Sequence, residues 1–246
     1  MEYVCTKRNR IDMSCEKEEI DINTSSNLLE ARIYKKLRFF DLDMDLNLKK
    51  EVLVIQGHSG SGKTTLLNCI SGIAQPDKGF VNIESDILYS DEKKINKPIR
   101  DRNIGYMFQN YALFPNMTVE KNLIFGINKK NLGHMKYLND LMEIFKISHL
   151  KNRYPGDISG GEKQRVALAR SLTTRPKVML MDEPFSALDT ETKDILYREF
   201  LEFKKEFDIG VMLITHNDEE ARYLGDRIIK IDNGKIISIE DKNIDW

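Results

Sequence analysis

The chain of 246 residues has little cysteine, no long apolar run and almost no net charge, and each absence excludes a class of protein. Its three cysteines, Cys5, Cys15 and Cys69, show no zinc-ligand spacing and no disulfide framework, which is typical of a reducing compartment. No apolar stretch reaches the roughly 18 residues that cross a bilayer, and the N-terminus has no signal-peptide core. The formal charge of −1 provides no basic field for nucleic acid. We therefore expect no nucleic-acid partner, and any membrane crossing would require another chain.

What is present is ordinary for a globular protein, with 41% hydrophobic and 31% charged residues. Residues 1–27 alternate charges with isolated apolar residues and end in the turn-prone NTSSN, so we interpret them as a polar, flexible extension. Cys5 and Cys15 fall in this extension, where surface thiols are the interpretation we favour over a redox or metal role. Residues 28–246 are expected to form one folded domain.

The apolar patterns of residues 28–246 predict an α/β fold. Residues 29–34 indicate a strand, and FFDLDMDLNL at 39–48 alternates as a half-buried antiparallel strand does. EVLVIQ, NIGYMFQ, KVMLMDE and GVMLITH are apolar without such alternation, which favours strands buried on both faces. Helical stretches separate them, as in a mainly parallel sheet covered on both sides. Residues 110–158 show helical periodicity and no strong strand, so we expect an inserted helical subdomain there.

A glycine-rich segment follows the predicted strand EVLVIQ and precedes a predicted helix. It reads GHSGSGKT and satisfies the pattern G-x-x-x-x-G-K-[ST] in the context that this pattern requires. Glycines let backbone N–H groups approach phosphate oxygens, and the helix N-terminus adds partial positive charge. Lys63 would bind the β- and γ-phosphates and the Thr64 hydroxyl would bind Mg²⁺. The residues expected to contact the nucleotide here are Gly57, His58, Ser59, Gly60, Ser61, Gly62, Lys63, Thr64 and Thr65.

A second glycine pair opens the segment ISGGEKQRVALAR at residues 158–170. Ser159 is a good helix N-cap, and Glu162 completes a capping box three residues later. The same helix start, with Gly160 and Gly161, can also present N–H donors to an anion. Both readings can hold at once, because a capped helix start at an interface is also a phosphate site.

Three further strand ends carry polar side chains. VMLMDEPFSALD ends a buried strand in the adjacent carboxylates Asp182 and Glu183 and continues to Asp189. VMLITH places His216 after another buried strand, and GYMFQ ends in Gln109. Parallel strands bring their carboxyl ends to one edge of a sheet, so we expect Asp182 and Glu183 beside the glycine-rich loop. A lone histidine at a strand end, such as His216, is more often structural than catalytic.

The joint order of these motifs resembles that of ABC ATPases, of the P-loop NTPase (RecA-like) fold with an added antiparallel β subdomain, over about residues 28–234. ISGGE resembles the signature usually written LSGGQ, with Ile158 and Glu162 as departures. The resemblance implies Mg²⁺ near Thr64, Gln109 and Asp182. It also implies that Glu183 activates the attacking water and that His216 contacts the γ-phosphate. SALD resembles the D-loop of the family, which implies that Asp189 lies near the subunit interface. An aromatic ring should also stack on adenine, and Tyr34 is the first candidate, with Phe39 and Phe40 behind it.

In this family the signature serves the partner subunit, so the resemblance implies a head-to-tail homodimer with ATP at the interface. It also implies membrane permease subunits, an indirect solute-binding protein, and a cytoplasmic location on the inner face of the membrane. YALFPNMTVEKNL at 111–123 matches the segment that receives the permease; the alternative is that Leu113 and Phe114 simply pack the helical subdomain.

Several segments resemble, residue by residue, the sequences of bacterial molybdate importer ATPases. These are KKLRFFDLDMDLNL, ILYSDEKKINKPIRDRNIGYMFQNYALFP and ISGGEKQR. Related importers of sulfate, tungstate, iron or polyamines share much of this, so they remain alternatives. The chain ends soon after IIKIDNGKII, and feedback through a C-terminal oxyanion-sensing domain is therefore not expected. The alternative from another class is a soluble ABC ATPase that acts on DNA or ribosomes. Such proteins typically carry long insertions or a second cassette, and this sequence shows neither. A phosphate-loop kinase is a further alternative, but it does not explain SGGEKQR.

Overall fold

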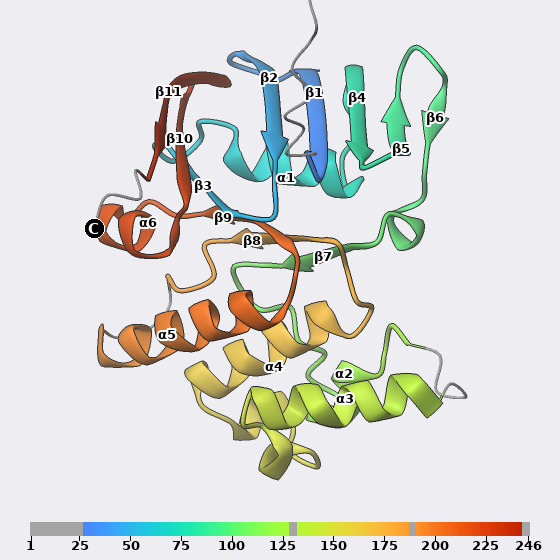
Figure 1. Ribbon diagram of the computed structural model, residues 1–246, viewed down its shortest axis with the longest axis vertical. Coiled ribbons are helices and arrows are strands. Elements are labelled where there is room, and N and C mark those ends of the chain that lie inside the picture. The colour runs from blue at the N-terminus through green and yellow to red at the C-terminus, as the bar shows by residue number, and fades with distance from the viewer. Residues whose placement is uncertain (1–26, 128–131, 187–189, 243–246) are drawn as a thin grey trace, which may run out of the picture.

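The larger of two sheets carries most of the residues singled out above. The structure, a computed structural model, describes residues 27–127, 132–186 and 190–242. Within these ranges the larger sheet has the strand order β11-β10-β3-β9-β8-β7, parallel except for the β10–β11 hairpin (Figure 1). Its strands are β3 (Val52–Gln56), β7 (Ile104–Met107), β8 (Val178–Asp182), β9 (Gly210–Ile214), β10 (Arg227–Asp232) and β11 (Lys235–Asp241).

The second sheet is antiparallel and has the order β2-β1-β4-β5-β6 in the described part of the chain. The expected alternation appears in β2, where every second side chain of DLDMDLNL is buried. Its strands are β1 (Leu29–Lys36), β2 (Asp41–Leu48), β4 (Lys78–Ile83), β5 (Asp86–Ser90) and β6 (Ile95–Asn96). Helix α1 (Lys63–Ser71) lies between the two sheets and fills that space with Leu66, Leu67 and Ile70 (Figure 1).

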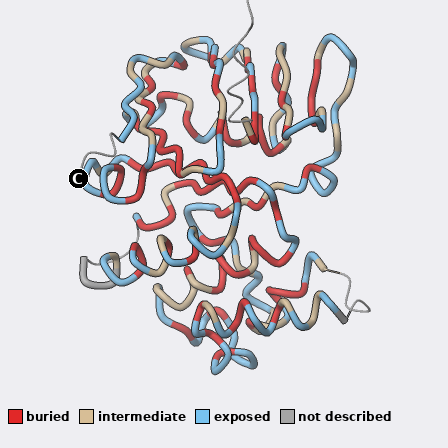
Figure 2. The backbone as a smooth tube through the Cα atoms, in the orientation of Figure 1, coloured by how far each residue is buried: buried red, intermediate tan, exposed pale blue. Residues whose placement is uncertain are grey.

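β3, β8 and β9 are buried on both faces, as their lack of alternation predicted. In the edge strand β7, Ile104 and Tyr106 are only partly buried, because no further strand of the described chain covers that side. In β3, Val52 and Val54 face the core shared with the helices below the sheet, whereas Leu53 and Ile55 face α1 and the antiparallel sheet. β8 and β9 divide their side chains between the same two cores. Figure 2 shows these strands as the continuous buried centre of the molecule. A sheet buried in this way holds its carboxyl ends rigidly, which positions the groups that follow them.

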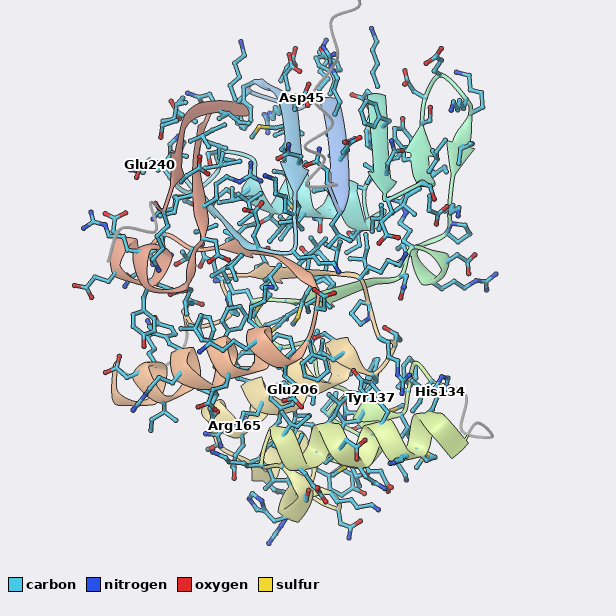
Figure 3. The ribbon with its side chains drawn as sticks, in the orientation of Figure 1. Asp45, His134, Tyr137, Arg165, Glu206 and Glu240 are labelled. Carbon is cyan, nitrogen blue, oxygen red and sulfur yellow. The ribbon has the colours of Figure 1, made fainter. Side chains whose placement is uncertain are left out.

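Helices cover the other face of the larger sheet (Figure 1). They are α2 (Val119–Leu123), α3 (Leu132–Ile144), α4 (Gly160–Leu172), α5 (Thr190–Glu206) and α6 (Asp218–Leu224), with 3-10 turns at Ile99–Asp101, Ser148–Leu150 and Pro155–Asp157. Arg165 of α4, labelled in Figure 3, donates to Glu199 of α5 at 2.9 Å and joins these two helices. The predicted α/β architecture is thus confirmed.

The segment between β7 and α4 contains only helices and turns in its described residues. The buried side chain of Asn122 holds the start of this segment together. The Asn122 amide donates to the carbonyl oxygens of Phe114, Met117 and Thr118, and the Asn122 side-chain oxygen accepts from the Phe114 N–H. The exact subdomain boundaries stay a prediction. None of the described helices is long and apolar enough to cross a membrane. The extension up to Ser26, with Cys5 and Cys15, lies outside the described residues.

Candidate functional site

The glycine-rich loop joins β3 to α1 with a backbone that only glycine accommodates easily. Gly60 and Gly62 have φ values of 82° and 104°, which place them in the region where a Cβ is disfavoured. A Cβ on Gly57 would lie 2.3 Å from the carbonyl oxygen of Ile231 in β10. Gly62 is the N-cap of α1, and no described side chain caps this helix. The backbone N–H groups of the first turn are therefore available for an anion.

Lys63 is buried at the start of α1 and folds back on its own loop. Its Nζ donates to the carbonyl oxygens of Gly57 at 2.7 Å and His58 at 2.8 Å. Burial lowers the pKa of the ammonium, while the carboxylates of Glu183 and Asp182 act in the opposite direction. A desolvated cation beside free N–H groups is suited to bind a polyphosphate.

The two carboxylates at the end of β8 lie in different surroundings. Asp182 is buried, and burial raises its pKa, opposed by a hydrogen bond from the Thr64 side chain. Glu183 follows with a positive φ of 47° and lines the cavity beside the loop. Such a backbone is strained in a non-glycine residue and is common at functional sites.

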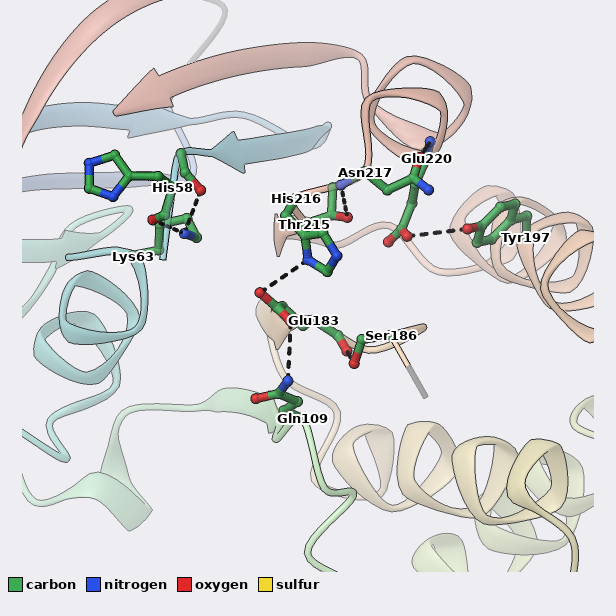
Figure 4. Close-up of polar contacts among 11 residues, drawn as sticks. His58, Lys63, Gln109, Glu183, Ser186, Tyr197, Thr215, His216, Asn217 and Glu220 are labelled. Carbon is green, nitrogen blue, oxygen red and sulfur yellow. Dashed lines mark hydrogen bonds and ion pairs between the residues drawn. The ribbon is translucent and has the colours of Figure 1, made fainter. Parts of the chain in front are cut away.

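Three of the predicted site residues meet at Glu183 (Figure 4). Gln109, after β7, donates its Nε2 proton to Glu183 Oε2 at 3.1 Å. His216, after β9, brings Nδ1 to 3.4 Å from Glu183 Oε1. Three neighbouring strands thus deliver an amide, a carboxylate and an imidazole to one point. The strand ends predicted the position of the carboxylates, whereas the roles of Gln109 and His216 were implied by the resemblance to ABC ATPases.

A cavity of about 450 Å³ connects the loop with these groups. Lys63, Thr64, Gln109, Asp182 and Glu183 all line it. A hydroxyl, an amide and a carboxylate beside a phosphate site fit Mg²⁺, which usually takes one or two protein carboxylates and completes its shell with phosphate and water. The described residues contain no cluster of three or more His, Cys, Asp or Glu that would hold a metal by itself.

The aromatic end of this cavity differs from the prediction. Tyr34 does not line it; Phe39 and Phe40 do, together with Leu37 and Arg38. The reason is the length of β1, which continues to Lys36, so the β1–β2 turn brings later residues to the loop. Tyr34 remains within the strand, where its hydroxyl donates to Asp41 at 2.8 Å. The structure thus places Phe39 and Phe40 at the cavity rather than Tyr34, and which ring stacks on adenine stays a prediction.

Phe39 and Phe40 have distinct surroundings. Phe40 packs against the glycine-rich loop, with its ring 3.5 Å from where a Cβ on Gly62 would lie. Phe39 is 85% exposed, with the Arg38 guanidinium 5.2 Å from its ring centre. The exposed ring is free to stack on a planar ligand. Sequence reasoning missed Arg38, because nothing in its spacing distinguished it from other surface cations.

The second glycine pair lies apart from this cavity, and none of residues 159–162 lines it. Ser159 caps α4, accepting the Glu162 N–H at 3.3 Å, while the Glu162 carboxylate accepts the Ser159 N–H at 2.7 Å. The bonds from Ser159 lower the pKa of Glu162. The predicted capping box is present. Asp189 lies outside the described residues.

The model of the ABC transporter family matches residues 39–186. The chain belongs to the ABC transporter family. Among relatives of this family, molybdenum import ATP-binding protein ModC of Haemophilus ducreyi is 38% identical over 87% of the chain and 60% of the relative. Molybdate/tungstate import ATP-binding protein WtpC of Pyrococcus horikoshii is 40% identical over 86% and 60%. Sulfate/thiosulfate import ATP-binding protein CysA 2 of Agrobacterium fabrum is 38% identical over 85% and 63%. The chain thus spans about three-fifths of these relatives.

Solved ABC cassettes share the fold. The ADP conformation of MJ1267, an ATP-binding cassette of an ABC transporter, has a TM-score of 0.76 and 26% identity, covering 89% of this chain and 92% of that one. A dimeric post-hydrolysis state of the ATP-binding cassette MJ0796 with ADP and Pi has a TM-score of 0.71 and 29% identity over 87% and 98%. The predicted P-loop NTPase fold is confirmed.

Proposed function

We propose that this chain is the ATP-hydrolysing subunit of an ABC importer for molybdate or a related oxyanion. The observation that supports it best is the meeting of Gln109, Glu183 and His216 beside the cavity lined by Lys63 and Asp182. These groups are those that in-line attack of water on a γ-phosphate requires. The free α1 N-terminus and the Lys63 ammonium bind the phosphates.

Each residue then has a definite task. Glu183 orients the attacking water and accepts its proton, and Gln109 and His216 hold that carboxylate in place before the nucleotide arrives. Thr64, Asp182 and Gln109 hold Mg²⁺, which neutralises charge on the phosphates. Burial raises the pKa of Asp182, and the Thr64 hydroxyl and the Lys63 ammonium oppose that rise. Phe39 stacks on adenine.

The nucleotide site is completed by a second copy of the chain. The signature at Ser159–Glu162 lies outside the cavity, so its helix N-terminus is used by an ATP bound to the partner subunit. Two chains then pair head to tail, with one ATP at each of the two sites between them. The dimeric cassette among the structural relatives supports this arrangement. ATP closes the dimer and hydrolysis releases it.

A permease contact is supported by the aromatic groups after Gln109. Phe114 and Phe125 are 37% and 60% exposed, with ring centres 4.5 Å apart, and the Arg170 guanidinium lies 5.6 Å from the Phe114 ring centre. Leu113, in contrast, packs on the helical core. An exposed aromatic pair beside a buried scaffold is suited to receive an apolar helix. The chain would thus sit on the cytoplasmic face of the membrane, with a solute-binding protein acting through the permease.

The solute assignment rests on the relatives, whose names include molybdenum, molybdate/tungstate and sulfate/thiosulfate import. The cassette itself does not touch the solute, so importers of sulfate, tungstate, iron or polyamine remain the second candidates. A soluble ABC ATPase acting on DNA or ribosomes lacks a comparable observation.

The test is ATP-dependent uptake of radiolabelled molybdate into vesicles that hold this subunit with its co-purifying permease. Uptake should be blocked by tungstate, weakly affected by sulfate and lost in Lys63→Ala. Phe114→Glu should abolish uptake while ATP hydrolysis persists, because the charge disrupts only the permease contact. Hydrolysis without any molybdate uptake in the wild type would refute the solute and retain the ABC ATPase.

A further inference from the structure

The turn between β10 and β11 contacts the outer side of the glycine-rich loop. The Gly234 N–H donates to the carbonyl oxygen of Ser61 at 3.1 Å. At the other end of the loop, Gly57 lies so close to Ile231 that no Cβ fits between them. These contacts hold the loop backbone on both sides of His58.

His58 contributes the side-chain contact to the same turn. Its Nε2 lies 2.5 Å from Asp232 Oδ1, and its Nδ1 lies 2.7 Å from the carbonyl oxygen of Ser59. A carbonyl oxygen and an ionised carboxylate only accept hydrogen bonds, whereas a neutral imidazole has one N–H. Both contacts are therefore satisfied together only when the ring is protonated. Accordingly, the pKa of His58 is raised, first by the Ser59 carbonyl and then by Asp232, against burial and the Lys63 charge.

The other charged groups around His58 have partners of their own. They line a cavity of about 390 Å³ between the loop, β10 and the start of α6. Asp218 accepts from Gln56 at 3.0 Å, His216 faces Glu183, and Lys230 pairs with Glu240 at 3.1 Å. Asp232 is thus the carboxylate assigned to His58.

The position of His58 matters for phosphate binding because its carbonyl oxygen accepts the Lys63 ammonium at 2.8 Å. Movement of His58 would displace one of the two carbonyl groups that orient Lys63. We propose that Asp232 is a positioning residue for nucleotide binding, which holds protonated His58 and so keeps the glycine-rich loop and Lys63 in the conformation that receives the phosphates. This inference rests on the proposed use of the loop as the ATP site.

The sign of the pH effect follows from the raised pKa. The contact is complete below the ordinary histidine value of 6.5 and is lost as pH rises through the higher value of the folded protein. Nucleotide affinity should therefore fall toward alkaline pH. Because the pair is exposed, salt screening keeps the effect modest.

The experiment measures Kd for ATP in the intact chain from about pH 5.5 to 9, a range that spans histidine titration. Wild-type Kd should rise about three- to fivefold across a midpoint above 6.5, the size of one exposed charged hydrogen bond. Asp232→Asn should bind more weakly at acidic pH and move the midpoint down, and Asp232→Glu should restore it. Asp218→Asn is the matched control, since it removes a carboxylate from the same cavity without touching His58, and should keep the wild-type midpoint.

A second readout follows the His58 ring by NMR without nucleotide. Asp232→Asn should lower the His58 pKa, and in hydrolysis assays it should raise the KM for ATP far more than it lowers kcat. A wild-type pH profile in Asp232→Asn, with an unchanged His58 titration, would overturn this inference and leave the ATP site intact. Absence of ATP binding in the wild type would overturn the site itself, and the positioning role with it.

Discussion

Helix α1 begins after a glycine-rich loop and helix α4 begins with a glycine pair, yet their N-termini are built in opposite ways. α1 starts at Gly62 without a side-chain cap among the described residues, beside the buried cation Lys63. α4 starts after the N-cap residue Ser159 with a complete capping box, in which the Glu162 carboxylate accepts the Ser159 N–H. One end is left open to an external anion, and the other supplies an anion of its own.

This difference indicates two distinct tasks for two similar motifs. The open end lines the cavity, and in our proposal it binds phosphate within one chain. The capped end is satisfied without a ligand and does not line that cavity, and in our proposal it meets a nucleotide carried by another chain. In our proposal, each nucleotide site combines α1 of one chain with α4 of the other, so each chain contributes one half to each of two sites.

The largest effect should come from mutating the two helix ends, each in a separate variant. Lys63→Ala removes the phosphate cation, and Gly160→Glu places a negative charge where the partner's phosphate would approach. Each variant alone should lose at least about 100-fold of its ATPase activity. The acidic residue at the first turn of α4 favours the helix, so the fold should persist.

Mixing the two variants tests the comparison directly. About half of the randomly paired dimers are mixed, and each mixed dimer has one of two sites intact, so about a quarter of wild-type activity should return. The measurement is ATP hydrolysis at increasing ratios of one variant to the other. A mixture as inactive as its components would show that both helix ends act within one chain.

Glu183→Gln tests the same comparison in another way, because it should stop hydrolysis after ATP has brought α1 of one chain to α4 of the other. Loss of the water-activating carboxylate should lower kcat about 10²- to 10⁴-fold while ATP still binds. ATP should then hold α1 of one chain to α4 of another, and size-exclusion chromatography should show an ATP-dependent dimer. Wild-type turnover in this variant would remove Glu183 from its assigned role.

Much of this arrangement followed from local sequence. VLVIQ of β3 has no alternation and is buried on both faces, whereas DLDMDLNL of β2 alternates and is buried on one face. The period of apolar residues in a strand thus predicts how many of its faces are buried. Lys63, Gln109, Asp182, Glu183 and His216 came together because parallel strands end at one edge of a sheet. The capping box of α4 is a local motif and needed no tertiary information.

The features that escaped prediction depend on contacts between distant segments. Tyr34 was favoured by its distance in sequence from Lys63, but the register of β1 against β2 decides which aromatic faces the loop. Asp232 reaches His58 only because β10 lies beside β3 in the sheet, and sequence does not reveal strand order. Packing between segments sets both outcomes.

A smaller effect should separate Phe39 from Tyr34 at the open helix end. Phe39→Ala removes the exposed ring and should raise Kd for ATP about three- to tenfold, as loss of one aromatic stack does. Kd for tripolyphosphate should stay the same, because that ligand has no base. Tyr34→Ala is the matched control and should leave ATP affinity unchanged. Weaker ATP binding in Tyr34→Ala alone would make Tyr34 the stacking residue instead of Phe39.

The smallest effect concerns the stability of the capped end. Ser159→Ala removes the acceptor for the Glu162 N–H and should lower the free energy of unfolding by about 1 kcal/mol. The corresponding fall in Tm is about 2–4 °C for a chain of this size. Glu162→Gln should cost less, because glutamine also completes a capping box.

The pH dependence of the cap distinguishes these contributions. The pKa of Glu162 is lowered by its bonds to Ser159, so its contribution is present above the ordinary value of 4.5 and is lost as pH falls through the lower value. The stability difference between wild type and Glu162→Gln should therefore shrink in acid. Thermal unfolding from about pH 3 to 7 measures it, a range that brackets carboxylate titration. A difference independent of pH would mean that the Glu162 charge does not stabilise the start of α4, and the contrast with the open α1 would then rest on Ser159 alone.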